Sequence, residues 1–172
     1  EGNMKGYYKE QQMTADAFDE ENYLKTGDMG EYDGDGFLKI TGRVKDQFKT
    51  DKGKYISPAP IEVKLLSNTD VEHVCIVGTG VPQPMALICL SDSGKKKAKD
   101  ELIKDLTGSL DAINPLLEKF EKIEKMVIMK ENWTITNNMI TPSLKVKRNE
   151  IEKIHLPKYP EWYDKPGTVT WE

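Results

Sequence analysis

Three apolar runs constrain the fold of this chain more than any other feature of its sequence. They cover His73–Val77, Met85–Leu90 and Lys125–Met129. A strand with one face in water alternates apolar and polar residues, whereas an uninterrupted apolar run is typical of a strand buried on both faces. The chain is therefore predicted to build a small three-stranded sheet covered by helices.

Helical patterns separate these runs and make the predicted fold class α+β. Ser57 is a candidate N-cap with Pro58 at the first helical position, and this helix is expected to end at Asn68. The other predicted elements are helices over residues 95–110, over residues 110–120 and from Pro142 to about Ile154, followed by an irregular tail.

The first part of the chain is rich in Gly, Asp, Tyr and Thr and predicts a β-hairpin over residues 31–40. Its Asp-Gly steps supply the positive φ angles that a tight turn requires. A calcium loop built on Asp33 and Asp35 is the alternative. It fails because Phe37 and Val44 stand at loop positions where ligands are required.

Composition and charge exclude several classes of function. The formal net charge is −4, whereas a nucleic-acid binder usually carries a basic face. Cys75 and Cys89 lie in apolar runs and predict buried free thiols, and the absence of a CxxC pair argues against a zinc site. Nothing resembles a membrane span or a signal peptide, so a cytoplasmic protein is expected. Because the chain starts with Glu1, it is interpreted as part of something longer.

Four separated segments together resemble the adenylate-forming acyl-CoA synthetases. Gly2–Tyr7 is similar to the family's GxxMxGY segment, Tyr23–Asp28 ends in its TGD motif, and Gly42–Glu62 follows its GRxKDxxKxxGxxIxPxxIE signature. Thr141–Arg148 resembles the segment around the family's catalytic lysine, usually GKxxR. Leu144 replaces the usual glycine there, a departure that is common in the long-chain subgroup.

The resemblance implies two structural parts. Residues 1–41 resemble the terminal strands of a large amino-terminal AMP-binding domain, and they form the hairpin arm. Residues 42–172 resemble the mobile carboxy-terminal lid. The acyl pocket and the main ATP phosphate loop of the family are missing from this chain, so it is not expected to be active alone.

The resemblance assigns a catalytic role to Lys145, which would stabilise charge during adenylation. Asp28 and Arg43 would bind the nucleotide, Asp28 through the ribose hydroxyls. Considered as isolated residues, Lys145 is a solvated lysine, Asp28 a turn residue and Arg43 half of a surface ion pair. These alternatives stay open.

The resemblance places Lys45 at the position about which the family's lid rotates, and Gly53 with Lys52 resembles the loop along the pantetheine arm of CoA. Lys52 is equally compatible with a solvated surface lysine. No metal ligand is assigned to this chain, because the Mg²⁺ that accompanies ATP would be held mainly by the missing domain.

The implied reaction is the ATP-dependent joining of a long-chain fatty acid to CoA through an acyl-adenylate. The alternatives are an aryl-CoA ligase, an adenylation domain that loads a carrier protein, or a non-catalytic interaction domain. Fatty acid, ATP and CoA are the expected partners of the full enzyme. Peripheral membrane contact and a homodimer formed through residues 1–41 are left open.

Overall fold

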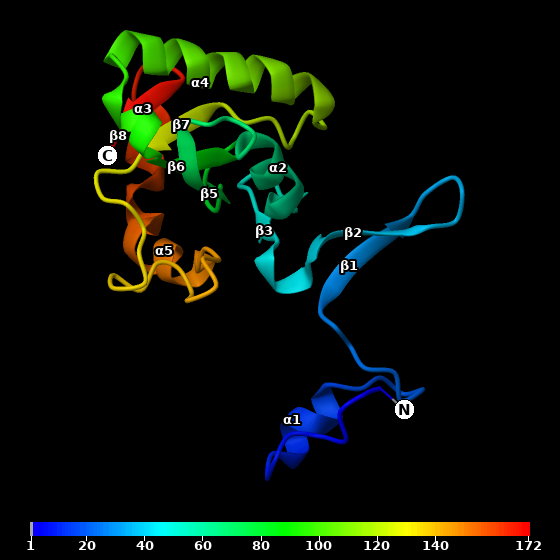
Figure 1. Cartoon of the computed structure of the whole chain (residues 1–172). Helices are drawn as coiled ribbons and strands as arrows, with labels where there is room; N and C mark the ends of the chain where they lie inside the picture. The colour runs from blue at the N-terminus through cyan, green and yellow to red at the C-terminus, as the bar shows by residue number, and fades with distance from the viewer. Residues whose placement is uncertain (1) are drawn as a thin grey trace. The chain divides into compact units, whose positions relative to one another are not determined.

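The computed structural model describes residues 2–172, which divide into two compact units (Figure 1). The first unit ends at Lys45, and the second comprises Asp46–Glu172. The boundary between residues 41 and 42 that the resemblance implies concerns a longer enzyme and stays a prediction.

The first unit contains the predicted hairpin. β1 and β2 pair antiparallel, with Glu31 opposite Lys39. The connecting turn closes because the Asp33 carboxylate accepts hydrogen bonds from the backbone amides of Asp35 and Phe37. No residue between 2 and 45 is buried. The elements of this unit are α1 (Gln11–Asp16), β1 (Asp28–Tyr32) and β2 (Leu38–Arg43).

The second unit holds the core of the described chain and follows an α+β order, as predicted. Its helices are α2 (Pro58–Leu65), α3 (Asp92–Lys96), α4 (Lys99–Ile113), α5 (Arg148–His155) and α6 (Tyr159–Asp164). Its strands are β3 (Phe48–Lys49), β4 (Tyr55–Ile56), β5 (Val71–Val77), β6 (Met85–Leu90), β7 (Lys125–Ile128) and β8 (Val169–Trp171).

The main sheet of the second unit has the order β5-β6-β7-β8 within the described residues. β5 is antiparallel to β6, whereas β7 and β8 are added in parallel. The prediction of three strands was wrong, because Val169 in β8 pairs with Met126 in β7. A strand of only three residues is too short to show a periodic pattern, so the tail was predicted to be irregular.

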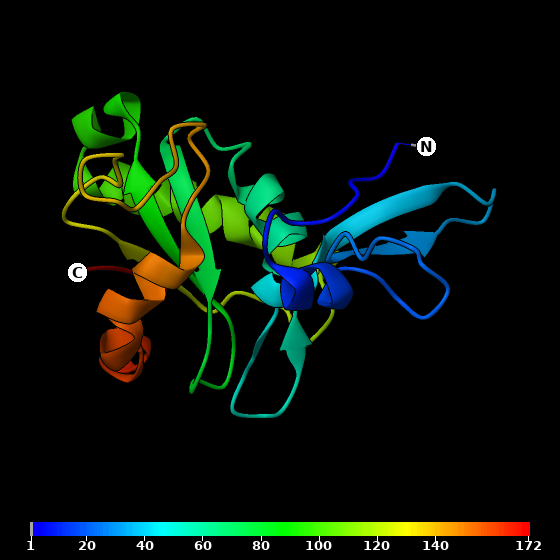
Figure 2. The ribbon, with the colours of Figure 1, turned by 90° about the horizontal axis from the view of Figure 1, so that it is seen from below.

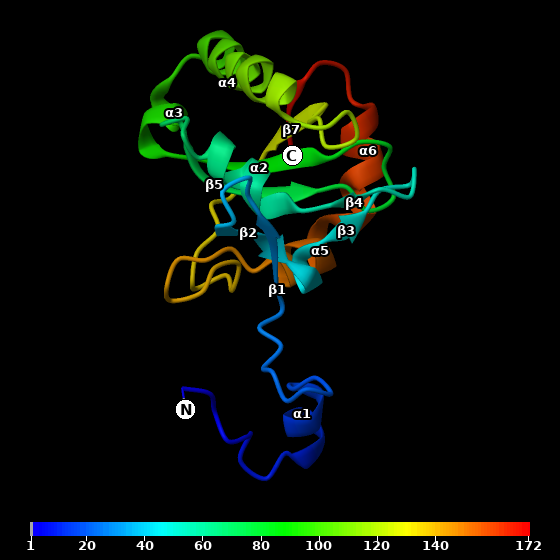
Figure 3. The same ribbon diagram turned by 90° about the vertical axis from the view of Figure 1, so that its right-hand side faces the viewer.

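Helices cover both faces of this sheet (Figures 1 and 3). Alternate residues of β6 enter different clusters, Ile88 and Leu90 on the face of α2 and α4, and Leu87 and Cys89 on the face of α5 and α6. Seen from below, the orange helix α5 lies in front of the strands and α4 behind them (Figure 2). Every residue of β6 is buried, as its uninterrupted apolar run predicts.

Three helix predictions need correction. The helix predicted over residues 95–110 is interrupted, because Lys97 and Ala98 are extended and separate α3 from α4. The helix predicted over residues 110–120 is absent. α4 ends at Ile113, and Pro115 lies in a short 3₁₀ turn. The last predicted helix begins at Arg148 rather than directly after Pro142.

The cysteine prediction is confirmed, since Cys75 and Cys89 are buried and free. Burial raises the pKa of the Cys75 thiol to about 12, so this group stays a neutral thiol near pH 7. Ser57 occupies the N-cap position of α2, but its side chain makes no capping bond. It accepts a hydrogen bond from Gln47 Nε2 at 3.1 Å instead.

Candidate functional site

Asp28 and Arg43 meet at the open end of the β1–β2 hairpin. The two residues are register partners, and Arg43 Nε lies 3.2 Å from Asp28 Oδ1. Gly27 adopts φ +75°, and its carbonyl accepts a 2.9 Å hydrogen bond from the Val44 amide. Two motifs that are separated in the sequence are thus joined at one end of a hairpin.

The Asp28–Arg43 pair is accessible rather than buried. The side chains are 32% and 64% exposed, respectively. An exposed ion pair contributes only about 0–1 kcal/mol, so either partner can turn to a ligand at little cost. Lys45 follows in the 3₁₀ turn Val44–Asp46 and is exposed.

Gly53 lies in the turn between β3 and β4. Its φ of +77° is in the left-handed region that favours glycine, and its amide donates a 3.0 Å hydrogen bond to the Thr50 carbonyl. The Thr50 amide in turn donates to the Lys54 carbonyl at 3.1 Å. Lys52 is exposed within this turn.

Contacts with the rest of the second unit hold the two ends of this turn in place. Thr50 is buried, and the Asp51 amide donates a 3.2 Å hydrogen bond to the Val81 carbonyl. The Lys54 ammonium lies 5.7 Å from the centroid of the Phe120 ring. The turn is therefore a fixed loop with an accessible tip.

Lys145 lies in a second tight turn, Thr141–Lys145. The Thr141 amide donates to the Lys145 carbonyl at 2.8 Å, and Thr141 Oγ1 accepts from the Lys145 amide at 3.0 Å. Leu144 has φ +59° with its side chain 64% exposed. The departure from glycine that the sequence shows at Leu144 thus falls at a position where the backbone is left-handed.

The Lys145 side chain is exposed and lines a pocket of about 660 Å³. The pocket is bounded by α2, β5, the Lys145 turn and the start of α5. Its wall combines apolar side chains with polar and charged ones, and the latter are Asp46, Glu62, His73, Lys145, Lys147, Arg148, Asn149 and Glu150. Neither Lys52 nor Gly53 belongs to it. The Gly53 and Lys145 turns therefore present separate surfaces.

Glu62 and Arg148 form an ion pair in the wall of this pocket, and neither was assigned a role from the sequence. Their side chains are only 19% and 12% exposed. The Arg148 guanidinium donates to the Glu62 carboxylate and to the Ile76 carbonyl. Both residues stand inside segments that carry the resemblance, but a contact between residues so distant in sequence has no local signal.

No metal-binding cluster is formed by the part of the chain that the structure describes. Among residues 2–172, no group of three or more His, Cys, Asp or Glu side chains is arranged to hold an ion. Every helix in the same range is too short or too polar to cross a bilayer.

Comparisons with known proteins agree on one family. A family model described as the AMP-binding enzyme C-terminal domain matches residues 45–165. Fatty acyl-CoA synthetase B of Dictyostelium discoideum is 31% identical over 179 residues, which cover 93% of this chain and 26% of that protein. Long-chain-fatty-acid–CoA ligase 5 of Mus musculus is 30% identical over 178 residues, with 93% and 26% coverage.

Solved structures support the same fold. The adenylation domain of a carboxylate reductase from Mycobacterium chelonae superposes with a TM-score of 0.81 at 21% identity, over 94% of this chain and 26% of that one. The o-succinylbenzoate CoA synthetase of Bacillus subtilis, in complex with an acyl-adenylate, gives 0.62 at 25% identity, with 87% and 28% coverage. The chain spans about a quarter of the length of these relatives.

Proposed function

The chain belongs to the family of AMP-binding enzyme C-terminal domains, and on that premise we propose that it is the lid of a long-chain fatty acid–CoA ligase. Residues 42–172 are assigned to the lid and residues 1–41 to the last strands of the amino-terminal domain. The remainder of the enzyme holds the acyl pocket and most of the ATP site, so the chain alone is not expected to catalyse the reaction.

The proposed reaction has two steps. A carboxylate oxygen of the fatty acid attacks the α-phosphorus of ATP, the α–β anhydride bond breaks, and pyrophosphate leaves. The sulfur of CoA then attacks the acyl carbon of the adenylate, the acyl–phosphate bond breaks, and AMP leaves with loss of the thiol proton. The first step brings two anions together and therefore requires fixed positive charge.

The exposed lysine on a hydrogen-bonded turn is the observation that carries this proposal. Lys145 presents a mobile ammonium from a backbone that Thr141 holds at three points, through its amide, its carbonyl and its hydroxyl. Such a compact cation suits contact with both the carboxylate and an α-phosphate oxygen. The pocket beside it leaves room for a second domain or a ligand to approach.

Asp28 and Arg43 are proposed to bind the nucleotide. A carboxylate can accept hydrogen bonds from two neighbouring ribose hydroxyls, and the Arg43 fork can donate to oxygen atoms of the same nucleotide. Their weak mutual ion pair supports this proposal, because a ligand can replace it at low cost.

Lys45 is proposed as the hinge, and Gly53 with Lys52 as the CoA-facing loop. Gly53 allows a close approach of backbone to a thin pantetheine arm, since it has no side chain. Lys145 and Gly53 lie on separate turns of one unit, which supports a lid that presents one turn in each step. The Mg²⁺ that accompanies ATP is proposed to be held mainly by the part of the enzyme that lies outside this chain.

The long-chain acyl group is the finer part of the proposal. The similarity to fatty acyl-CoA and long-chain-fatty-acid–CoA ligases supports it. An aryl-CoA ligase or a carrier-loading adenylation domain is the second candidate, because a carboxylate reductase and an o-succinylbenzoate CoA synthetase share the fold. Adenylation rates of the full enzyme with palmitate, benzoate and acetate would separate these candidates. A preference for benzoate would overturn the long-chain assignment.

Lys145→Ala in the full-length enzyme tests the lid role directly. Adenylation should fall by about 10²–10³-fold, which corresponds to the loss of one preorganised charge. Thioester formation from supplied acyl-adenylate should be spared. Lys153→Ala on the exposed face of α5 is the control and should change neither step. An equal loss of both steps in the Lys145 variant would refute the assignment.

A further inference from the structure

The chain leaves the Lys145 turn directly into the core of the second unit. α5 begins at Arg148, three residues after Lys145, and the Arg148 side chain is directed inward rather than into solvent. Its two terminal nitrogens donate to different elements, one to the Ile76 carbonyl of β5 and the other to the Glu62 carboxylate of α2. Arg148 thus ties the end of the turn to a strand and to a helix.

Glu62 completes the same arrangement. Its carboxylate also accepts a 2.8 Å hydrogen bond from the Ile76 amide. Both backbone groups of Ile76 are therefore satisfied by this pair on the free edge of β5, which is the terminal strand of the sheet. The planar guanidinium makes two contacts in fixed directions, which an ammonium group cannot reproduce.

Hydrogen bonds and apolar packing restrict the segment that leads from the core to Lys145. Ile140 and Val146 form a β-bridge, and the Lys147 amide donates to the Met139 carbonyl at 2.8 Å. Met139 and Ile140 are buried at the entrance of the segment. Residues 139–147 therefore form a closed loop that is anchored by apolar packing on one side and by Arg148 on the other.

We propose that the Glu62–Arg148 pair positions Lys145 for the adenylation step. The pair holds the exit of the loop at a fixed place on β5, and so sets where the Lys145 ammonium can reach. This inference rests on the proposed function of Lys145. Arg148 is a positioning residue and not a catalytic one, because its guanidinium is occupied by Glu62 and Ile76 and is largely shielded from solvent.

Arg148→Lys and Glu62→Gln in the full-length enzyme test the proposal. Arg148→Lys keeps the positive charge but loses the planar fork that reaches Glu62 and Ile76 at the same time. Glu62→Gln keeps the shape of the side chain but removes the negative charge that pairs with Arg148. Adenylation should slow by about 10–100-fold, because a displacement of about 1 Å in a reacting group has effects of this size. The loss should appear in kcat more than in the KM for ATP. Thioester formation from supplied acyl-adenylate should be little changed.

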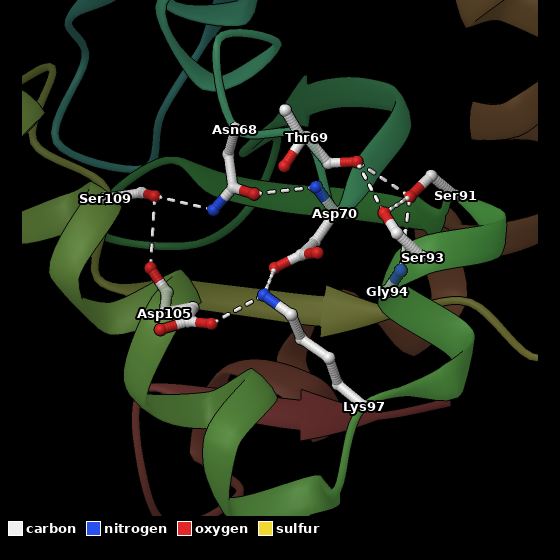
Figure 4. Close-up of polar contacts among 9 residues, drawn as sticks. All are labelled: Asn68, Thr69, Asp70, Ser91, Ser93, Gly94, Lys97, Asp105 and Ser109. Atoms are coloured by element: carbon white, nitrogen blue, oxygen red, sulfur yellow. Dashed lines mark hydrogen bonds and ion pairs between the residues drawn. The ribbon is translucent and has the colours of Figure 1, made fainter.

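Lys97 offers a matched control in the same unit. Its ammonium lies 2.6 Å from Asp70 Oδ2 and 2.7 Å from Asp105 Oδ2, and it joins the α3–α4 junction to the start of β5 (Figure 4). It does not line the pocket beside Lys145. Lys97→Met should make the enzyme unfold at a lower urea concentration. It should not slow adenylation more than thioester formation, or the reverse.

Hydrogen exchange in the same full-length variants provides a second measurement. Amides of residues 141–147 should exchange faster in Arg148→Lys and Glu62→Gln, and at the native rate in Lys97→Met. Unchanged exchange in this loop would overturn the proposal, and so would equal slowing of both steps in the Arg148 and Glu62 variants. If Lys145→Ala slows adenylation while Arg148→Lys does not, the proposed function stands and the positioning role falls. If Lys145→Ala has no effect on adenylation, both fall.

Discussion

The Gly53 and Lys145 turns satisfy the same backbone requirement with different residues. Gly53 has φ +77° and Leu144 has φ +59°, both in the left-handed region. Glycine adopts this region freely, whereas a residue with a side chain loses about 1–2 kcal/mol there. The first turn is relaxed and the second is strained. The Lys145 turn therefore owes its shape to its hydrogen bonds and anchors rather than to the backbone preference of Leu144.

Gly53→Ala should break the first turn and has the largest effect that we expect from this comparison. Alanine at φ +77° should cost about 1–2 kcal/mol, since the nearest atom to an added Cβ is the flexible end of Lys49 and space is not limiting. Urea unfolding of the chain would measure the loss.

Gly108→Ala is the matched control for this change. Gly108 lies in α4 without a positive φ, and no atom is within 4 Å of its added Cβ. Alanine should therefore stabilise the helix by up to about 1 kcal/mol. A loss of stability in both variants would contradict the conformational explanation.

Leu144→Gly is the reciprocal change and should sharpen the comparison. It relieves about 1–2 kcal/mol of left-handed strain but adds about 0.5–1 kcal/mol of backbone entropy to the unfolded chain. Because the side chain is 64% exposed, little packing is lost, and a net gain of roughly 0.5 kcal/mol is expected. Urea unfolding would detect it. Leu144→Ala keeps the strain and should show no gain, so an equal gain in both variants would argue against strain.

The smallest effect we expect is a pH dependence of the free energy of unfolding, and it arises from a residue outside both turns. His155 of α5 is buried, and burial lowers the pKa of its imidazole despite the opposing charge of Glu172. The unfolded state therefore takes up a proton before the folded state does, and stability should decline as the pH falls below the ordinary value of 6.5.

Unfolding of the wild type and of His155→Gln between pH 5 and about pH 8 checks this expectation. The free energy of unfolding should depend less steeply on pH near pH 6 in the variant than in the wild type. Glu172 and Lys158 also face His155, and the Glu172 carboxyl adds a loss at lower pH. Its pKa is lowered because hydrogen bonds from Lys158 and Lys130 outweigh the effect of burial. An unchanged slope near pH 6 would assign the dependence to groups other than His155.

The sequence predicted most of the sheet because burial leaves a strong local signal. Val74–Val77 and Met85–Leu90 are apolar at every position, and both became strands. The hairpin was predictable for a similar reason, since Asp33 is a turn residue with a local hydrogen-bonding partner. The helix boundaries were not. The extended Lys97 depends on a contact with the distant Asp70, and the turn at Thr141 is closed by hydrogen bonds of a hydroxyl and of the backbone, which an apolar pattern does not show.

The candidate site also contains residues that the sequence pointed to and a contact that it did not. Lys145 is exposed and Gly53 is left-handed, but their roles stay predictions, and the contact between Glu62 and Arg148 was missed. Both charged residues were visible, but only the packing of α2 and α5 around β5 brings them together. A single sequence shows that such charged residues are present, but it does not show which of them form an ion pair.

The parallel strand β8 has a consequence for how the second unit is made. Val169–Trp171 cannot join β7 until the ribosome has released the whole segment that connects them, including α5 and α6. During synthesis the outer edge of β7 thus stays open until β8 is made, whereas β5 and β6 can pair with each other as soon as both have emerged. A nascent second unit in that state would be most vulnerable to wrong pairing with other chains, and chaperone capture would be expected there.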